Sequence, residues 1–225
     1  MICLEDISRT YAMKSGLVYA LSRVSLSIER GEFVAVMGPS GSGKSTLMNI
    51  IGCLDRPTSG RYYLEDVDVS QLSDNDLAAV RNRKIGFVFQ NYNLLPRMTI
   101  LKNVELALMY AGHPRGARRE ATARAALEAV GLAQRVIHRP YELSGGQQQR
   151  AAIARALATD PALLLADEPT GSLDSATGEE IMHIFCELNR KGKTILLVTH
   201  EQAMTRYVHR IVRLKDGCIN REAGR

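Results

Sequence analysis

The sequence predicts an α/β protein with a parallel-sheet core, an antiparallel β region near the N-terminus and an inserted helical segment. From residue 160 onward, apolar runs typical of strands alternate with helical patterns, the arrangement of a parallel sheet with crossover helices. The earlier runs follow one another through short connections, one of them at Gly31-Glu32, and indicate antiparallel pairing. Residues 91–158 are almost wholly helical in pattern and are expected to form the insert.

The period of the apolar residues predicts each element in turn. Alternation and β-branched content predict strands at 2–7, 24–28, 33–38, 61–64, 85–89, 162–167, 194–198 and 210–214. Apolar residues three and four apart predict helices at 45–52, 100–110, 116–130, 145–158, 176–189 and 201–207. No internal repeat and no linker rich in Pro, Gly or Ser interrupts the chain, so we expect a single domain over residues 1–225.

Composition excludes several classes of protein. The 225 residues are 45% hydrophobic and 24% charged, as in ordinary globular chains, which excludes disorder and low complexity. Glu5 and Asp6 stand where a signal peptide would be basic and then apolar. No apolar run approaches the roughly 20 residues of a membrane helix, so we expect no transmembrane segment in this chain. The net charge of +5 is too small to distinguish nucleic acid, anionic lipid and polyphosphate as partners.

A glycine-rich stretch follows the strand expected at 33–38. It matches G-x-x-x-x-G-K-S between a strand and a helix, the context that this phosphate-binding pattern requires. Glycines let backbone N–H groups turn toward phosphate oxygens, Lys44 adds a positive charge, and Ser45 adds a hydroxyl ligand for Mg²⁺. The expected nucleotide-binding residues are Gly38, Pro39, Ser40, Gly41, Ser42, Gly43, Lys44, Ser45 and Thr46.

Two carboxylates end another apolar run. The run at 163–166 leads to Asp167 and Glu168, the pattern of a buried parallel strand that delivers both acids at its carboxyl edge, where ligands of open α/β sheets bind. Asp167 would hold Mg²⁺ through water, and Glu168 would orient and partly deprotonate an attacking water. Two acids after a strand more often mark a turn, but the glycine loop in the same chain favours the chemical role.

A third motif, Leu143-Ser144-Gly145-Gly146-Gln147, precedes a long helical pattern. Ser144 suits the N-cap position, and the two glycines expose backbone donors at the positive end of the helix dipole. The motif indicates a second anion site, although an ordinary capped helix could show the same residues.

These three motifs, in this order and spacing, resemble the ATP-binding cassette (ABC) ATPase family over essentially the whole chain. The resemblance implies a P-loop NTPase (RecA-like) parallel-sheet core, an N-terminal antiparallel β subdomain and an inserted α-helical subdomain. We expect the core and β subdomain at 1–90 and 159–225 and the helical subdomain at 91–158. The resemblance also implies ATP and Mg²⁺ as cofactors and ATPase activity.

Smaller motifs agree with this family. Gln90, which ends IGFVF, matches the Q-loop glutamine that contacts Mg²⁺ and the hydrolytic water. His200, which ends ILLVTH, matches the switch histidine that contacts the γ-phosphate. Tyr11 matches the aromatic residue that stacks on adenine. Alone, each of these would be an ordinary surface, capping or packing residue.

Ser172, Leu173 and Asp174 match the D-loop, which in this family crosses to the partner subunit. The sequence departs from the family at two positions. Ser172 stands where relatives often have Asn, and Glu201 follows the histidine where Asp is more usual. Neither departure touches the expected chemistry.

A finer resemblance lies in the strings NIIGCLDRPTSG, RNRKIGFVFQNYNLLPRMT and HRPYELSGGQQQR. They are similar to the ATPases of the macrolide-exporter and lipoprotein-release group, which power export, lipoprotein release or mechanotransmission through integral membrane permease subunits. The resemblance implies a peripheral position on the cytoplasmic side of the inner membrane, with a periplasmic adaptor reached through the permease as a further partner. A separate subunit and an excised domain of a longer chain both remain open.

The same group predicts two protein contacts. A second copy of the chain would form a head-to-tail ATP-sandwich dimer, in which the signature residues 143–147 of one copy face the glycine loop of the other. Leu94 and Leu95, after the Q-loop glutamine, would help receive a cytoplasmic helix of the permease. Plain core packing is the alternative role for these two leucines.

Two other functions compete with a transporter ATPase. A soluble ABC ATPase acting on nucleic acid or ribosomes would usually carry a second cassette, coiled-coil arms or a zinc insertion, and the sequence shows none. The basic cluster Arg115, Arg118, Arg119 and Arg124 lacks interleaved aromatic residues, so we expect a solvated helix face and no nucleic-acid partner. A scaffold that binds nucleotide without hydrolysing it is disfavoured by Glu168.

Overall fold

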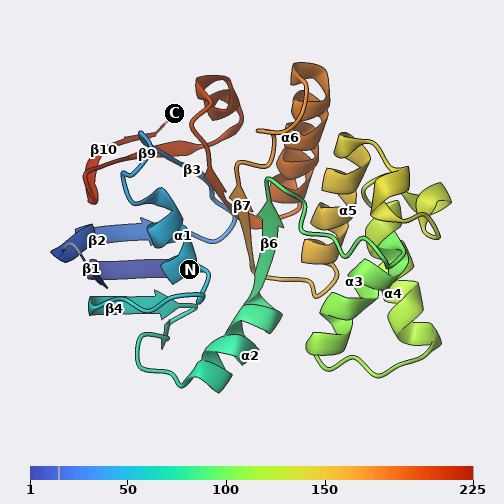
Figure 1. Cartoon of the computed structure of the whole chain (residues 1–225), viewed down its shortest axis with the longest axis horizontal. Coiled ribbons are helices and arrows are strands. Elements are labelled where there is room, and N and C mark those ends of the chain that lie inside the picture. The colour runs from blue at the N-terminus through green and yellow to red at the C-terminus, as the bar shows by residue number, and fades with distance from the viewer. Residues whose placement is uncertain (15, 225) are drawn as a thin grey trace. The chain divides into compact units, whose positions relative to one another are not determined.

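The structure, a computed structural model, describes residues 1–14 and 16–224. The chain divides into two compact units. The first unit contains Met1–Arg81 and Asn189–Arg225, and the second contains Asn82–Leu188 (Figure 1). The α/β class is confirmed. The boundaries of these two units differ from those of the subdomains expected from the sequence, at 1–90, 91–158 and 159–225. The expected subdomains stay a prediction.

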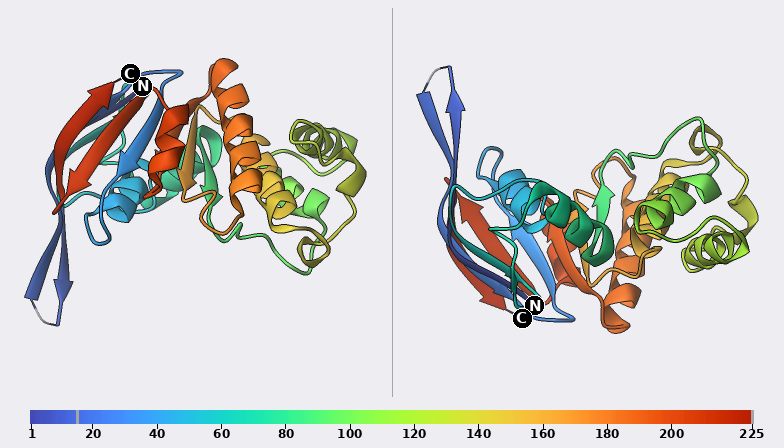
Figure 2. Two further views of the ribbon diagram at one scale, coloured as in Figure 1. Left: turned by 90° about the horizontal axis from the view of Figure 1, so that it is seen from above. Right: turned by 90° about the horizontal axis from the view of Figure 1, so that it is seen from below.

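An antiparallel sheet in the first unit has the strand order β2-β1-β4-β5. Its strands are β1 (Ile2–Met13), β2 (Gly16–Ile28), β4 (Ser59–Leu64) and β5 (Val67–Asp68). Apolar residues alternate with polar ones near the pairing of Ile2 with Ile28, so one face is buried, as period-two patterning requires. The predicted antiparallel region is therefore confirmed. β1 and β2 also run past β4 as a two-stranded hairpin (Figure 2), which the sequence analysis did not predict.

The other strands of the first unit are ordered β10-β9-β3-β8. They are β3 (Phe33–Met37), β8 (Thr194–Val198), β9 (Arg210–Lys215) and β10 (Cys218–Gly224). Every residue of β3 is buried, and β3 pairs in parallel with both β8 and β9. The helix α1 (Lys44–Ile51) contacts β2 of one sheet and β8 of the other. This buried parallel strand is what positions the glycine loop that follows it.

The second unit pairs two parallel strands and packs helices beside them. β6 (Ile85–Phe89) pairs with β7 (Leu163–Asp167). The helices α3 (Ile100–Tyr110), α4 (Ala117–Glu128) and α5 (Gly145–Leu157) pack on one another, and α5 also packs on β6. Gly86 permits that approach, because a Cβ there would lie 2.5 Å from the carbonyl oxygen of Ala156 in α5. Two short 3-10 helices, Ala133–Arg135 and Pro140–Glu142, connect α4 to α5.

The helix α6 (Ser175–Arg190) runs for 16 residues after β7. A bilayer-spanning helix needs about 20 predominantly apolar residues. Within residues 1–14 and 16–224, no helix has both the length and the apolar character to cross a membrane.

Several sequence-based expectations were wrong in detail. The helix α2 (Asp74–Lys84) was missed because it buries only Leu77 and so lacks an apolar stripe. The helix expected at 201–207 is a 3-10 helix at Gln202–Tyr207, and residues 91–98, expected within a helical segment, form turns and loop. The edge strand β10 was also missed. It depends on pairing with β9 and on the ion pair between Arg210 and Glu222 at 2.5 Å.

Tyr62 provides a test of the packing in the first unit. Its side chain is 2% exposed, and its hydroxyl donates a hydrogen bond of 2.7 Å to the carbonyl oxygen of Ile51, the last residue of α1. Tyr62→Phe should lower the free energy of unfolding by about 1–2 kcal/mol, because the buried carbonyl then loses its donor. Urea unfolding followed by circular dichroism measures the loss.

Tyr63→Phe is the matched control for this prediction. The Tyr63 hydroxyl accepts an exposed hydrogen bond of 3.4 Å from Arg61, which water can replace. Its loss should change stability by less than about 0.5 kcal/mol. Equal destabilisation by the two variants would contradict the assigned role of the buried bond.

Candidate functional site

The glycine loop joins β3 to α1 in the first unit. Gly43 is the N-cap of α1 and has a left-handed backbone, with φ 100°. A Cβ on Gly43 would collide with the carbonyl oxygen of Ala20, and one on Gly38 would collide with that of Leu214. Only glycine suits both positions, so the loop keeps its backbone N–H groups accessible to a ligand.

Two polar side chains give the loop its chemical character. The Lys44 ammonium donates hydrogen bonds of 2.8 Å to the carbonyl oxygens of both Gly38 and Pro39, which hold this positive charge within the loop. The Ser42 hydroxyl is 2% exposed and finds no hydrogen-bond partner among residues 1–14 and 16–224. A buried hydroxyl without a partner is costly, so an oxygen-rich ligand at the loop would satisfy it. Ser45 is exposed and Thr46 half-buried in the first turn of α1.

His200 follows β8 at the same edge as the glycine loop. Because β3 and β8 are parallel and Val36 pairs with Val198, both strands end together. The backbone N–H of Thr199 donates to the carbonyl of Val36 at 3.2 Å, which extends this pairing toward the exposed His200. The first unit therefore brings the predicted phosphate loop and the predicted switch histidine to one sheet edge.

Tyr11 lies in β1, within a polar cluster. Its hydroxyl donates to Asp55 at 2.7 Å, and the Arg9 guanidinium lies over its ring, 4.5 Å from the ring centre. Arg9 also forms a 2.8 Å ion pair with Asp55. These contacts hold the ring in place and occupy one of its faces, so only the opposite face is left for stacking. The role of Tyr11 in binding adenine stays a prediction.

Gln90 and the two acids lie at one edge in the second unit. Phe89 of β6 pairs in register with Asp167 of β7, so Gln90 and Glu168 leave the sheet side by side. The backbone of Glu168 is left-handed, with φ 44°. Non-glycine residues seldom adopt this conformation, and such strain is often found at functional positions.

The turn after these acids carries Ser172, Leu173 and Asp174. The backbone N–H of Leu173 donates to the carbonyl of Thr170 at 2.9 Å, while Ser172 and Asp174 are exposed. Asp174 accepts hydrogen bonds from the hydroxyl and the backbone N–H of Thr177, at 2.6 Å and 3.0 Å, in the first turn of α6. These bonds lower the pKa of Asp174, because they favour its charged form.

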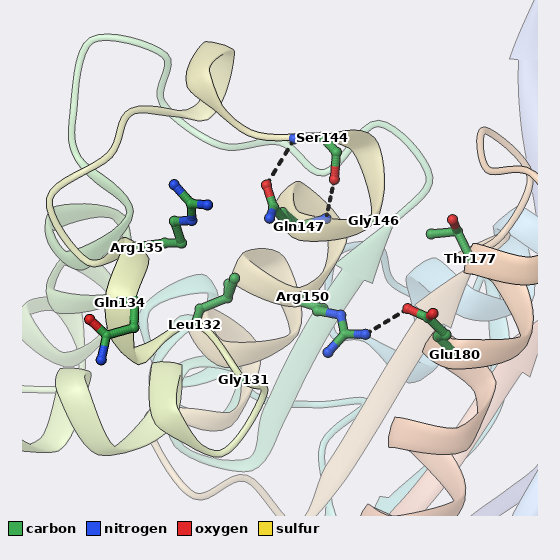
Figure 3. A pocket seen from close by; sticks show the side chains of 10 residues that line it. All are labelled: Gly131, Leu132, Gln134, Arg135, Ser144, Gly146, Gln147, Arg150, Thr177 and Glu180. Carbon is green, nitrogen blue, oxygen red and sulfur yellow. Dashed lines mark hydrogen bonds and ion pairs between the residues drawn. The ribbon is translucent and has the colours of Figure 1, made fainter.

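Ser144 caps α5, as the sequence predicted. Its hydroxyl accepts a hydrogen bond from the N–H of Gln147 at 3.3 Å, and the Gln147 side chain accepts one from the N–H of Ser144 at 3.1 Å (Figure 3). Leu143, just before the cap, is 7% exposed and anchors the turn. A pocket of about 330 Å³ opens beside this helix start and is lined by Arg135, Arg150 and Gly146, among others.

Two interactions of this helix were missed by sequence reasoning. The capping box formed by Gln147 was detectable, since Ser-x-x-Gln before a helix is its signature. Gln149 was not detectable. Its side chain is fully buried and donates 2.8 Å to the carbonyl of Pro169, which follows Glu168. This hydrogen bond connects α5, the signature helix that follows residues 143–147, to the turn after Glu168. The two bonded residues are 20 positions apart in the sequence.

Comparison with known protein families matches residues 21–171 to the family described as ABC transporter. The chain belongs to this family. It is 55% identical over 219 residues to the uncharacterized ABC transporter ATP-binding protein YknY of Bacillus subtilis, covering 97% of this chain and 95% of YknY. It is 53% identical over 229 residues to the macrolide export ATP-binding/permease protein MacB of Syntrophobacter fumaroxidans. That match covers 100% of this chain and 32% of MacB.

Solved structures of ABC cassettes confirm the predicted P-loop NTPase fold. The dimeric structure of MJ0796, a bacterial ABC transporter cassette according to its description, superposes with a TM-score of 0.90 at 50% identity. The match covers 100% of this chain and 98% of that one. The predicted similarity to macrolide-exporter ATPases is likewise confirmed, by MacB.

Gly43 offers a test of the loop geometry. Gly43→Ala should lower the melting temperature by several degrees, because it adds both left-handed strain of about 1–2 kcal/mol and a collision with the Ala20 carbonyl. Gly41→Ala is the control for thermal melting. Gly41 is also left-handed, with φ 78°, but a Cβ there would meet no atom of residues 1–14 and 16–224 within 4 Å, so Gly41→Ala should lose stability through backbone strain alone. Equal melting temperatures would refute the assigned steric role of Gly43.

Proposed function

We propose that this chain is the ATP-binding and ATP-hydrolysing subunit of an ABC transporter complex and that it powers export, lipoprotein release or mechanotransmission through a membrane permease. The observation that carries the proposal is the glycine loop, with its left-handed Gly43, its buried Ser42 hydroxyl and the Lys44 ammonium held by loop carbonyls. These groups suit phosphate oxygens. The description of one MJ0796 structure, bound to ADP and Pi after hydrolysis, adds support from a cassette that is 49% identical.

The side-chain oxygens expected to bind Mg²⁺ are too few to hold the ion alone, but they suit an ion that is bound together with a nucleotide. In the described part of the chain, no three His, Cys, Asp or Glu side chains gather into a metal-binding cluster. Mg²⁺ is usually held by one or two carboxylates with waters and substrate phosphates, and Ser45, Gln90 and Asp167 offer oxygens of that kind. When bound, Mg²⁺ would neutralise charge on the phosphates.

Three residues would handle the reacting water and phosphate. Glu168 would accept a proton from the attacking water and orient it, and Gln90 would help to hold that water in place. His200 would donate a hydrogen bond toward the γ-phosphate. Nucleotide binding would order this chain's own loops around the phosphate, which lowers the entropy of the reacting groups.

Two copies of the chain would share each ATP. The exposed Ser144 and the half-buried Gly145 lie at the start of α5 on the surface of the second unit, where a hydroxyl and a backbone N–H can face a ligand. A head-to-tail dimer would place residues 143–147 of one copy against the nucleotide on the other, with Ser172, Leu173 and Asp174 beside the shared boundary. Dimeric MJ0796 structures support this arrangement.

A membrane permease would be the mechanical partner. MacB joins an ATP-binding region to a permease in one protein, and this chain matches about a third of it. We infer a peripheral position on the cytoplasmic side of the inner membrane, with the permease linking the chain to a periplasmic adaptor. Leu95 is 43% exposed, while its backbone N–H and carbonyl are both bound by the buried Asn103 side chain. An anchored loop with an outward leucine suits docking better than core packing.

Glu168→Gln is the experiment that tests the hydrolytic role. The amide keeps the shape of the side chain but cannot accept a proton, so turnover should fall by at least about 100-fold while ATP binding persists. ATP should then trap a dimer that elutes early in size-exclusion chromatography, whereas the unaltered chain elutes mainly as a monomer. Glu201→Gln is the matched control and should keep normal turnover.

Ser144→Ala separates the shared site from a site within one copy. It should reduce hydrolysis and ATP-dependent dimer formation, but leave the affinity of the monomer for a fluorescent ATP analogue within about twofold. An equal loss of monomer affinity would argue against the two-copy site.

Normal turnover in the Glu168→Gln variant, by contrast, would overturn the assignment of Glu168 as the residue that accepts a proton from water.

Leu95→Glu tests the docking surface. Because Leu95 is exposed, the variant should keep its melting temperature and basal ATPase activity, yet lose stimulation of ATPase activity by the permease. Leu108→Glu is the control for core packing. Leu108 is 0% exposed, so a buried unpaired charge should cost more than about 4 kcal/mol. Normal coupling in Leu95→Glu would exclude this leucine from the contact.

A further inference from the structure

The residues after Gln90 hold a strained backbone. Tyr92 and Asn93 are consecutive and both left-handed, with φ 58° and 49°. Tyrosine rarely adopts this conformation, and each such residue costs of order 1–3 kcal/mol and persists only where its surroundings impose it. Other contacts of the second unit must therefore hold this turn in place.

Arg155 supplies the first of these contacts. It lies near the end of α5, and its guanidinium donates to the carbonyl oxygens of both Tyr92 and Asn93, the former at 2.9 Å. Burial lowers the pKa of Arg155, as expected of a guanidinium taken partly out of water. The segments it connects are 62 residues apart in sequence.

The Tyr92 side chain supplies the second contact, at the opposite end of α5. A Cβ on Gly145 would lie 2.8 Å from the Tyr92 hydroxyl and 3.1 Å from a methyl group of Leu173. Tyr92 thus occupies the space that a larger residue at Gly145 would need. Since Gly145 and Arg155 are separated by about 15 Å along a helix, the turn is braced near both ends of α5.

We propose that Tyr92 and Arg155 are positioning residues that join the turn after Gln90 to the signature helix α5, so that the two shift together. The inference rests on the proposed function, in which Gln90 serves the nucleotide on its own copy and residues 143–147 serve the nucleotide on the partner. Any displacement of the turn at one site would then be carried by α5 to the other site. On this reasoning, position 145 requires glycine because the Tyr92 hydroxyl occupies the space that a larger side chain there would need.

A double-mutant cycle tests the contact between Tyr92 and Gly145. Gly145→Ala should lower kcat by about tenfold or more, because the new methyl group meets the Tyr92 hydroxyl and displaces the helix start. Adding Tyr92→Phe removes that oxygen and should restore kcat to within about threefold of Tyr92→Phe alone. If the double variant stays as inactive as Gly145→Ala, the proposed contact is not what requires glycine, and the proposal fails.

Amide hydrogen exchange without nucleotide tests the joined movement independently of ATPase activity. Arg155→Met keeps an unbranched apolar stem but removes the guanidinium donors, so exchange in residues 90–95 and 144–148 should accelerate together by about tenfold. Arg155→Lys, which retains a charged donor, should recover part of the protection. Arg124→Met, which removes an exposed ion pair with Glu120 in α4, is the control and should alter neither segment.

The exchange result also separates this proposal from the proposed function. Faster exchange confined to residues 90–95 would overturn the link to the signature helix, even if the chain is an active ATPase. Joint acceleration in a chain without ATPase activity would leave the link standing and overturn the proposed function instead. If Arg155→Met fails to fold, the kinetic cycle at Gly145 decides the question.

Discussion

Parallel pairing of buried strands is the constraint on which the rest of the structure depends. Parallel neighbours end at a common edge, so whatever follows them in sequence is brought together in space. In the first unit, β3 and β8 deliver the glycine loop and His200 to one edge. In the second unit, β6 and β7 end in register and bring Gln90 together with the acids Asp167 and Glu168. These strands are mostly apolar, as is typical of parallel strands that are covered on both faces.

The loops beyond these edges keep strained conformations that the strands alone could not impose. Gly43 avoids the penalty by having no Cβ, whereas Glu168 and Tyr92 accept it. Each lies beside a contact that fixes its neighbourhood. Gln149 binds the carbonyl of Pro169, next to Glu168, and Arg155 binds the carbonyl of Tyr92 itself. Strain that is held in this way keeps reactive groups oriented before a ligand arrives.

The helix α5 contacts most of the segments of the second unit to which the proposed function assigns a role. The cap Ser144 and the two glycines lie at its start. Further along the helix, Gln149 binds the turn after the acids, and Arg155 near the end binds the turn after Gln90. A helix is stiff over this length, so a shift at one end reaches the other. Under the proposed function, this arrangement would link nucleotide chemistry to the exposed Leu95, which follows the same turn.

The sequence by itself determined the α/β class, the glycine loop, the two acids at the end of β7 and the cap at Ser144. These features are local, because each follows from a strand period, a turn or a few consecutive residues. Only the tertiary structure decided the roles of Gln149 and Arg155, since their partners lie 20 and 62 residues away and no spacing rule connects them. The same reason explains why α2 and β10 were missed. The residues of both elements carry little apolar pattern. β10 is ordered by its pairing with β9, and α2 is held by the local cap at Ser73 and by the hydrogen bond from Arg81 to the carbonyl of Cys53, 28 residues away.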